Sequence, residues 1–369
     1  MNDRPLRLLV IDDSALYRQL VRNTLREIPG VEVVGIAKGG QEALTLVDEL
    51  DPDLLTLDVQ MPVINGIEVL RVLKSKRSRA RAIMLSSLTA NGAQITTDAL
   101  LEGAFDFIHK PSGPDATANR QTLLSELTEK ITAFRLTPVL RRGHGVAPPI
   151  STSRTPHNTV HRASGGADAA TPRCDAVVIG TSTGGPVALS EVLPAIPGDF
   201  PAPILIVQHM PPQYTQSLAN RLNERSEIEV VEGAEGMAVA PGFAYIAPGG
   251  RHMRVERRAG RIVIGITSDP SENSCRPAAD YLFRSAAEVY GAKLMAVIMT
   301  GMGRDGTEGC RVIKQRGGHV ITQDADGCAV FGMPKAVADA LLSDETLTLG
   351  RIAEGLTRRV TGRRIAPQS

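Results

Sequence analysis

Short apolar runs alternate with segments of helical spacing along most of the chain, and this alternation restricts the fold more than any other feature. Before residue 136 the runs cover residues 6–12, 31–37, 53–58, 81–87 and 104–110. Helices are expected to begin near Ser14, Gly40, Gly66, Gln94 and Thr122, the last one ending near Phe134. Apolar runs of this kind are typical of parallel strands that are buried on both faces. The pattern therefore predicts a parallel sheet with helices on both sides.

The same alternation returns after residue 172. Apolar runs cover residues 175–180, 203–209, 293–300 and 318–324. Helices are expected near Val187–Leu193, Thr215–Arg225, Ala278–Tyr290, Thr307–Arg316 and Lys335–Leu342. Residues 242–267 are rich in β-forming residues, which predicts a β-rich insert. The chain is therefore predicted to be an α/β protein with two doubly wound parallel-sheet domains, the second of them Rossmann-like.

Residues 137–172 separate these two halves, and Pro, Gly, Ser, Thr and Ala dominate their composition. Such a segment cannot bury enough apolar surface to offset its ordering entropy. A surface loop within one domain is the alternative, but the length of the segment argues against it. The sequence thus predicts a first domain over residues 1–136, a flexible linker over 137–172 and a second domain over 173–369.

The overall composition argues against several classes of protein. The net charge is +1 over 369 residues, so no strong field favours nucleic acid or an anionic membrane. No apolar stretch reaches the length of about 18 residues that a membrane span needs, and the N-terminus lacks the features of a signal peptide. The cysteines are scattered and form no C-x-x-C motif, which is typical of reduced thiols in a cytoplasmic protein. They are Cys174, Cys275, Cys310 and Cys328.

Polar residues follow the predicted strands of the first half, at the sheet edge where open α/β sheets bind ligands. They are Asp12, Asp13, Asp58, Ser86 and Lys110. Three carboxylates that converge at one edge would repel one another unless a hard cation lay among them, and Mg²⁺ has the required preference for oxygen ligands. A carboxylate beside Mg²⁺ can attack a phosphoryl group. The alternative is that these residues only cap helices and form turns.

Residues 1 to about 135 resemble the receiver domain of bacterial two-component response regulators. The resemblance is carried by LLVIDDS, LLTLDVQMPVINGIEVL, IMLSSLT and FDFIHKPSG. It implies a flavodoxin-like sheet and phosphorylation of Asp58, with Mg²⁺ held by Asp12, Asp13 and Asp58.

The same resemblance assigns roles to the other strand ends. Lys110 is implied to sense the phosphoryl group, Ser86 to be the switch hydroxyl and Phe107 to be the switch aromatic residue. The Lys110–Pro111 peptide bond is implied to be cis.

In the second half, the first predicted strand leads into the turn GTSTGG, residues 180–185. A phosphate-binding Walker loop would need Gly-Lys-Ser/Thr here, and the dinucleotide fingerprint G-x-G-x-x-G is also absent. The turn matches G-x-S-x-G, in which small neighbours expose a serine nucleophile between a strand and a helix. Ser182 is the candidate nucleophile, and the alternative is that Ser182 only caps the helix.

Two later strand ends supply partners for this serine. His209 follows the strand PILIVQ, and Asp305 lies in the turn TGMGRDG after another strand. At one sheet edge these residues could form a Ser-His-Asp triad, in which His209 is the base and Asp305 orients the imidazole. His252, in the β-rich insert, is the rival base. The backbone N–H groups of Met302 and Thr183 are the candidate oxyanion donors.

The second half is similar to the catalytic domain of the chemotaxis methylesterases, the CheB family. The similarity is carried by VVIGTSTGGP, IVQHMPPQYT, YIAPGGRHM and MTGMGRDG. It implies hydrolysis of glutamyl γ-methyl esters on chemoreceptors, often with deamidation of receptor glutamines, and a chemotaxis histidine kinase as phosphodonor. It also implies that Arg276, in a loop near the site, contacts the substrate, although SENSC, residues 271–275, is less typical of the family. Ester hydrolysis is expected to need no cofactor.

The sequence leaves two rival functions open. One is a response regulator with a DNA-binding output, which would need a basic recognition helix that is not visible here. The other is a receiver fused to a small-molecule hydrolase. In the favoured interpretation, the unphosphorylated receiver covers the catalytic crevice and phosphorylation releases it.

Overall fold

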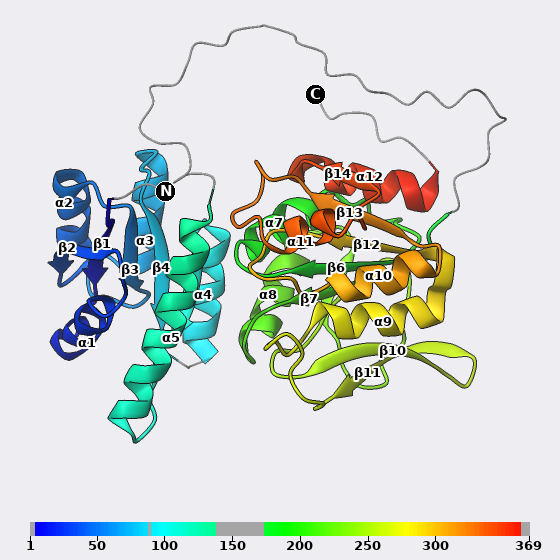
Figure 1. The fold of residues 1–369 in the computed structure, drawn as a ribbon, viewed down its shortest axis with the longest axis horizontal. Helices are drawn as coiled ribbons and strands as arrows, with labels where there is room; N and C mark the ends of the chain where they lie inside the picture. Colours follow the sequence, from blue (N-terminus) through cyan, green and yellow to red (C-terminus); the bar gives the residue numbers. More distant parts are fainter. Residues whose placement is uncertain (1–3, 88–89, 138–172, 363–369) are drawn as a thin grey trace, which may run out of the picture.

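The computed structural model describes residues 4–87, 90–137 and 173–362, so nearly all of the predicted linker lies outside the described residues. These residues form two parallel-sheet units that lie side by side, called here the N-terminal unit and the C-terminal unit (Figure 1). The architecture confirms the predicted α/β class. Among the helices that the structure describes, none combines the length and the apolar character that crossing a bilayer requires.

The N-terminal unit is a five-stranded sheet in the order β2-β1-β3-β4-β5, and all neighbouring strands are parallel. Its strands are β1 (Leu6–Ile11), β2 (Val31–Ala37), β3 (Leu54–Asp58), β4 (Arg81–Ser86) and β5 (Asp106–His109). Its helices are α1 (Ala15–Leu25), α2 (Gly40–Leu50), α3 (Gly66–Ser75), α4 (Ala90–Leu101) and α5 (Ala116–Arg135). This strand order is flavodoxin-like, and its direction reverses between β1 and β3, where such folds bind ligands.

Local sequence signals explain several helix boundaries in this unit. The side chain of Asn65 accepts a hydrogen bond from the Glu68 N–H, and the Glu68 carboxylate returns one to the Asn65 N–H, which fixes the start of α3. Helix α5 begins at Ala116 rather than near Thr122, because the Asp115 carboxylate caps it. Helix α4 begins at Ala90, one turn before the predicted start at Gln94.

The C-terminal unit is a seven-stranded parallel sheet in the order β14-β13-β12-β6-β7-β9-β8. Its strands are β6 (Ala176–Thr181), β7 (Ile204–Gln208), β8 (Glu229–Glu232), β9 (Phe243–Ile246), β12 (Leu294–Ile298), β13 (His319–Gln323) and β14 (Glu345–Leu347). Its helices are α7 (Gly185–Val192), α8 (Tyr214–Asn223), α9 (Ala279–Tyr290), α10 (Thr307–Gln315), α11 (Met333–Asp339) and α12 (Leu349–Thr361). The connection from β6 to β7 runs to one side and β12 lies on the other, so the sheet reverses direction at β6.

The predicted insert is smaller than expected. Only β10 (His252–Arg258) and β11 (Arg261–Thr267) form a separate antiparallel hairpin, whereas β9 pairs with β7 in the main sheet. The reason is that β9 is almost wholly buried, as a central strand must be. The sequence did not predict strands β8 and β14, because they have only four and three residues and carry charged side chains. Helix α12 was not predicted either.

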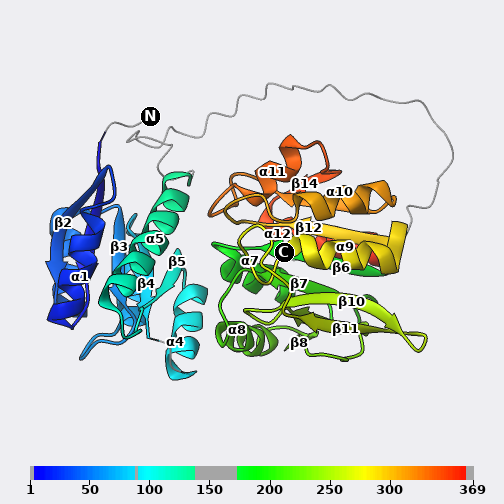
Figure 2. The same ribbon diagram turned by 60° about the horizontal axis from the view of Figure 1, so that its bottom comes forward.

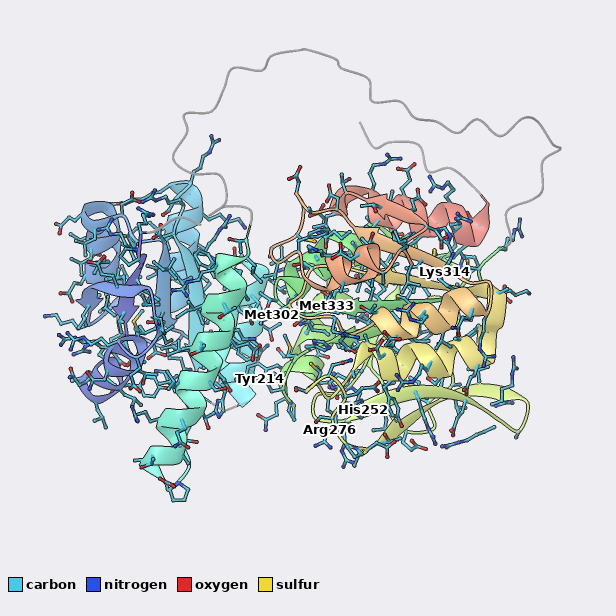
Figure 3. The ribbon with its side chains drawn as sticks, in the orientation of Figure 1. Tyr214, His252, Arg276, Met302, Lys314 and Met333 are labelled. Atoms are coloured by element: carbon cyan, nitrogen blue, oxygen red, sulfur yellow. The ribbon has the colours of Figure 1, made fainter. Side chains whose placement is uncertain are left out.

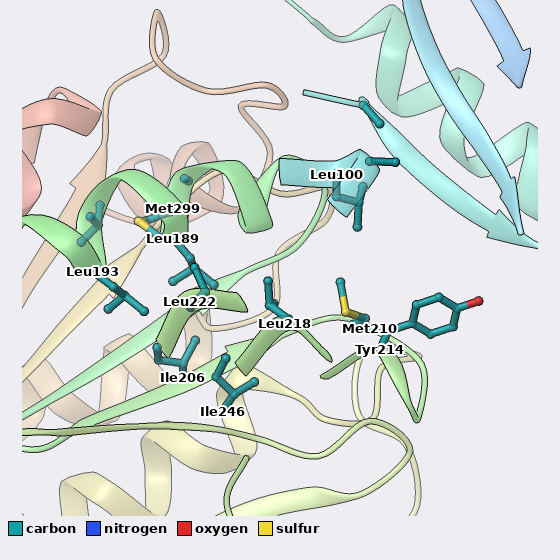
Figure 4. Close-up of a cluster of buried hydrophobic side chains, with 14 of the residues drawn as sticks. Leu100, Leu189, Leu193, Ile206, Met210, Tyr214, Leu218, Leu222, Ile246 and Met299 are labelled. Carbon is teal, nitrogen blue, oxygen red and sulfur yellow. The ribbon is translucent and has the colours of Figure 1, made fainter. Parts of the chain in front are cut away.

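The two units share a continuous apolar contact. Helix α4 packs on α7 and α8, and Figure 2 shows α4 and α5 on the side of the N-terminal unit that faces the C-terminal unit. Figure 4 shows Leu100 of α4 beside Met210, Tyr214 and Leu218, all of them buried in one cluster. Burying one Leu side chain of this kind stabilises a contact by about 1.5–3 kcal/mol.

Candidate functional site

The acidic residues of the N-terminal unit converge at the sheet edge, as predicted. Carboxylate oxygens of Asp12, Asp13 and Asp58 lie within 4.8 Å of one another. The Lys110 ammonium lies between two of them, 2.6 Å from Asp12 Oδ2 and 2.8 Å from Asp58 Oδ2. Three carboxylates and one ammonium leave two negative charges, which a divalent cation would balance. Because Asp13 is exposed, such a cation could keep part of its water shell, so these residues fit Mg²⁺.

Asp58 lies in a buried position, with 6% of its surface exposed. Burial raises the pKa of Asp58, and the neighbouring Lys110 ammonium only partly offsets this effect. The ring of Tyr17 lies 4.6 Å below the same ammonium, a cation–π contact that helps to hold Lys110 in place. A cation at this site would favour the ionised carboxylate that attack on a phosphoryl group requires.

The predicted switch residues contact the C-terminal unit directly. The ring centroid of Phe107 lies 4.5 Å from the ring centroid of Tyr214, which begins α8. The Tyr214 hydroxyl also donates a long hydrogen bond of 3.5 Å to Ser86 Oγ. One tyrosine therefore touches both switch residues. The Lys110–Pro111 peptide is trans, contrary to expectation; cis and trans X–Pro bonds differ by only about 0.5–1 kcal/mol, so a motif alone does not fix the isomer.

Ser182 lies in a sharp turn between β6 and α7. The turn requires glycine: Gly184 has a φ of +78°, and a Cβ at Gly185 would lie 2.0 Å from Gln208 Oε1. The Ser182 N–H donates to the Thr300 carbonyl at 3.0 Å, which ties the turn to the end of β12. Ser182 is half-buried, so part of its surface stays accessible, and its role as the nucleophile stays a prediction.

His209 and Asp305 are in direct contact, with His209 Nε2 2.7 Å from Asp305 Oδ2. The Asp305 carboxylate also accepts the backbone N–H groups of Ala279 (2.6 Å) and Asp280 (3.1 Å), at the start of α9. The side-chain amide of Asn273 donates to it at 2.9 Å. These donors and the helix N-terminus stabilise the ionised carboxylate and fix its direction toward His209.

The pKa values of this pair shift in opposite directions. Burial lowers the pKa of His209, but the hydrogen bond with Asp305 and the neighbouring Cys275 outweigh it and raise the pKa to about 9. Burial raises the pKa of Asp305, and the hydrogen bonds from His209 and the α9 backbone outweigh it, so the pKa of Asp305 is lowered. Both shifts favour an ion pair between the Asp305 carboxylate and a protonated His209 ring, while the catalytic role of Asp305 stays a prediction.

Ser182 and His209 occupy neighbouring strand ends, because Thr181 of β6 pairs with Gln208 of β7. The free ring nitrogen, Nδ1 of His209, faces Cys275 Sγ at 3.6 Å. Within the described residues no hydrogen bond joins this nitrogen to Ser182 Oγ. Catalytic hydrogen bonds are often long or misaligned without substrate, so this geometry leaves the predicted triad open.

The candidate oxyanion donors belong to segments next to Ser182: Thr183 follows it in the sequence, and a Cβ at Gly301, the residue before Met302, would lie 2.8 Å from Ser182 Cβ. The turn after β12 contains Gly303 at φ +86° and Gly306 at φ +89°, conformations that favour glycine. Neither the Met302 N–H nor the Thr183 N–H has an intramolecular acceptor in the part of the chain that the structure describes. Both are therefore available to a substrate oxygen.

The rival base His252 does not have a free nitrogen. Its Nε2 bonds to the Pro270 carbonyl at 3.1 Å, and its Nδ1 accepts from the Ala278 N–H at 3.3 Å. The ring is fully buried and stacks on Tyr281. Arg276 is exposed, and its guanidinium bonds to the carbonyls of Ser268 and Asp269. Figure 3 shows His252 and Arg276 together at one end of the C-terminal unit, away from Met302.

Three residues at the site were missed by sequence reasoning. Asn273 bridges the carboxylates of Asp305 and Asp280, at 2.9 and 2.8 Å, and Cys275 contacts His209. Burial raises the pKa of Asp280 to about 6. Asn273 and Cys275 belong to a turn whose geometry the sequence does not reveal, and only Asp280, near the start of a predicted helix, gave a signal.

The N-terminal unit covers this region of the C-terminal unit. Thr183, next to Ser182, donates from its hydroxyl to Asp106 Oδ2 of β5 at 2.5 Å. Met302 packs against the core of the N-terminal unit, and Val330 is fully buried within that core. Figure 3 shows Met302 and Tyr214 on the side that faces the N-terminal unit. A large substrate therefore meets the N-terminal unit before it reaches Ser182.

Comparison with known proteins gives matches to both units. Residues 8–120 match the family model "Response regulator receiver domain", and residues 177–356 match "CheB methylesterase". A protein-glutamate methylesterase/protein-glutamine glutaminase of Desulfotalea psychrophila is 47% identical over 96% of this chain and 98% of its own length. The protein of the same name from Thermotoga maritima is 43% identical over 98% of this chain and 100% of its own length.

One solved structure is similar to half of this chain. The crystal structure of the Thermotoga maritima CheB methylesterase catalytic domain is 46% identical and aligns with a TM-score of 0.50, covering 50% of this chain and 98% of that chain. Fold and sites together define a response regulator whose output unit is an ester hydrolase. The chain belongs to the CheB methylesterase family.

Proposed function

We propose that this chain hydrolyses glutamyl γ-methyl esters on the cytoplasmic helices of chemoreceptors, releases methanol, and also deamidates particular receptor glutamines. The observation that carries the proposal is the His209–Asp305 contact of 2.7 Å beside the Ser182 turn. Both reactions transfer an acyl group to water, so one nucleophile and one base serve for both. The names of the two relatives, which state both activities, support this substrate class.

In the proposed mechanism, Ser182 Oγ attacks the ester carbonyl and His209 Nδ1 takes its proton. The backbone N–H groups of Met302 and Thr183 stabilise the oxyanion of the tetrahedral intermediate. His209 then gives the proton to the leaving methanol, or to ammonia from a glutamine. Water attacks the acyl-enzyme by the same route in reverse, while Asp305 stabilises the imidazolium.

Control is proposed to reside in the receiver, residues 1–136, which a linker over 137–172 joins to the catalytic domain, residues 173–369. Asp58 accepts a phosphoryl group from a chemotaxis histidine kinase. Asp12, Asp13 and Asp58 would hold Mg²⁺, and the bound ion would supply positive charge to balance the phosphate. The Lys110 ammonium and the Ser86 hydroxyl bind the phosphoryl oxygens. Movement of Ser86 and Phe107 toward the phosphoryl group withdraws both from Tyr214, since Tyr214 contacts each of them.

Release of these contacts would expose the crevice. The receiver contacts Thr183 and packs on Met302, both next to the proposed oxyanion site. A tethered domain rebinds readily because its effective concentration is high, so phosphorylation only has to shift a docking equilibrium.

Methanol release from methylated receptor membranes tests the proposal. Wild-type protein should release methanol, and Ser182→Ala should lose several orders of magnitude in rate while keeping its fold. Near-normal release by a folded Ser182→Ala protein would reject the nucleophile. Hydrolysis of small esters without any release from receptor membranes would favour a small-molecule hydrolase instead.

A further inference from the structure

Cys275 is unlike the other cysteines of the chain. The other three are buried, whereas Cys275 is only half-buried. Its Sγ lies 3.6 Å from His209 Nδ1, the ring nitrogen that faces away from Asp305. The proposed hydrolysis uses that nitrogen as its base and has no step for the thiol, so the contact of the Cys275 thiol with His209 is left without a role.

A tight hairpin holds Cys275 in this position. Glu272 and Cys275 exchange both backbone hydrogen bonds, at 3.0 and 2.8 Å. The two residues between them, Asn273 and Ser274, have φ of +51° and +62°. Two successive positive φ values define a type I′ turn, a conformation that is costly for a serine. The turn that precedes Cys275 is therefore a strained one.

Side chains then fasten the hairpin to the catalytic framework. The Glu272 carboxylate forms two hydrogen bonds with the Arg284 guanidinium, at 2.6 and 2.7 Å. The Asn273 amide bridges Asp280 and Asp305. Asp305 therefore orients His209 and, through Asn273, also anchors the turn that carries the thiol. The thiol, the imidazole and the carboxylate form one connected array.

This array places a proton donor beside the sulfur of Cys275. The pKa of His209 is raised to about 9, so the ring is protonated at neutral pH. An imidazolium N–H beside Cys275 Sγ, 3.6 Å from Nδ1, can stabilise the negative charge that develops on sulfur when the thiol reacts. The thiolate is the form that peroxides oxidise, and the imidazolium can supply the proton that the leaving hydroxide takes up. The half-buried position leaves a path for a small oxidant.

We propose that Cys275 is a site of oxidation by hydroperoxides and that its sulfenic acid inhibits ester hydrolysis; the inhibition rests on the proposed function. The Cys275 thiolate attacks one oxygen of hydrogen peroxide, so that an S–O bond forms and the O–O bond breaks. Sulfur is oxidised, the peroxide oxygen is reduced, and the hydroxide released takes a proton from His209 Nδ1 to form water. The new hydroxyl occupies the space between sulfur and Nδ1, which then cannot receive the proton of Ser182.

Trapping of the sulfenic acid tests the site without any assay of activity. The full-length protein is treated with hydrogen peroxide and dimedone, and each cysteine is quantified by mass spectrometry. Cys275 should be labelled in preference to Cys174, Cys310 and Cys328. His209→Gln should lower labelling of Cys275 about tenfold, because it removes the cation beside the sulfur. Equal labelling of all four cysteines, or labelling that is unaffected in His209→Gln, would overturn the proposal.

Methanol release tests the inhibition. Peroxide should lower the wild-type rate about tenfold when most of Cys275 is oxidised, and a thiol reductant should restore it. Cys275→Ala and Cys275→Ser should each keep their own untreated rate in peroxide, whereas the matched control Cys328→Ala should be inhibited like wild type. Equal inhibition of the Cys275 variants would overturn the inhibition. Labelled Cys275 in a protein without esterase activity would reject the proposed function and retain the oxidation site.

Discussion

The Thr183 hydroxyl donates a hydrogen bond of 2.5 Å to the Asp106 carboxylate, across the boundary between the catalytic domain and the receiver. Thr183 directly follows the proposed nucleophile, and Asp106 begins the last strand of the receiver sheet. Lys130 of α5 lies 3.2 Å from the same carboxylate and balances its charge. The receiver is therefore hydrogen-bonded to the residue that follows the proposed nucleophile.

Removal of this hydrogen bond should weaken the docking of the receiver on the Ser182 turn. Thr183→Val keeps the backbone N–H but deletes the hydroxyl, and a hydrogen bond to a charged group contributes about 1.5–3 kcal/mol. The ratio of unphosphorylated to phosphorylated rate of methanol release should therefore rise about tenfold. Thr357→Val, which deletes an intrahelical hydrogen bond in α12, is the control and should leave the ratio unchanged. An unchanged ratio in Thr183→Val would show that this contact does not restrain the receiver.

Substitutions of His209 and His252 should differ sharply in their effect on the rate of methanol release. His209→Gln should lose activity on the scale of Ser182→Ala, because it removes the base. His252→Gln should retain most of the activity per folded molecule, since both nitrogens of His252 are bonded to backbone groups. Initial rates of methanol release decide the ranking, and the reverse order would move the active site toward the β10–β11 hairpin.

The pH dependence should follow from the raised pKa of His209. A general base must be neutral, so kcat/KM should rise with pH and level off near pH 9. Asp305→Asn removes the carboxylate whose hydrogen bond makes the largest contribution to raising the pKa of His209, so the rise should move to lower pH while the maximal rate falls. A profile that is flat from pH 6 to 9 would contradict the assignment of His209.

The free energy of unfolding should also depend on the protonation of His209, but it should fall as the pH rises. Between pH 6.5 and about 9 the folded protein binds a proton at His209 that the unfolded chain has lost. The free energy of unfolding should therefore fall over this window, and it should fall less in His209→Gln. Urea unfolding at a series of pH values measures the difference.

Activation should depend on Asp58 and on a divalent cation. Asp58→Asn should keep the basal rate but lose the increase with a small phosphodonor, because the amide cannot accept the phosphoryl group. Chelation of Mg²⁺ should remove the same increase from wild type, since the acidic site retains two uncompensated charges without it. Activation that persists in Asp58→Asn would reject Asp58 as the sole phospho-acceptor.

Much of the placement of the site residues was predictable, because the carboxyl ends of parallel strands lie at the same edge of a sheet. Asp12, Asp58 and Lys110 were expected to converge because each lies at the carboxyl end of a predicted strand, and the same argument applied to Asp305 and His209. The buried central strands gave clear signals, since each is an uninterrupted apolar run.

Contacts that depend on turns and on docking were not predictable. The hairpin that carries Cys275 uses positive φ at Asn273 and Ser274, which residue types alone do not reveal. Tyr214 meets Phe107 and Ser86 only because two separately folded units pack together. Strand β9 was assigned to the insert because its partner, β7, lies more than 30 residues earlier in the chain.

The receiver is proposed to cover the Ser182 site until Asp58 is phosphorylated. The most direct test of this proposal is the rate of methanol release from methylated receptor membranes by two proteins, the full chain and residues 173–369. The shorter protein should be more active than the unphosphorylated full chain. A phosphodonor with Mg²⁺ should raise the rate of methanol release by the full chain and leave the rate of the shorter protein unchanged. A shorter protein that is no more active than the unphosphorylated full chain would contradict the proposal.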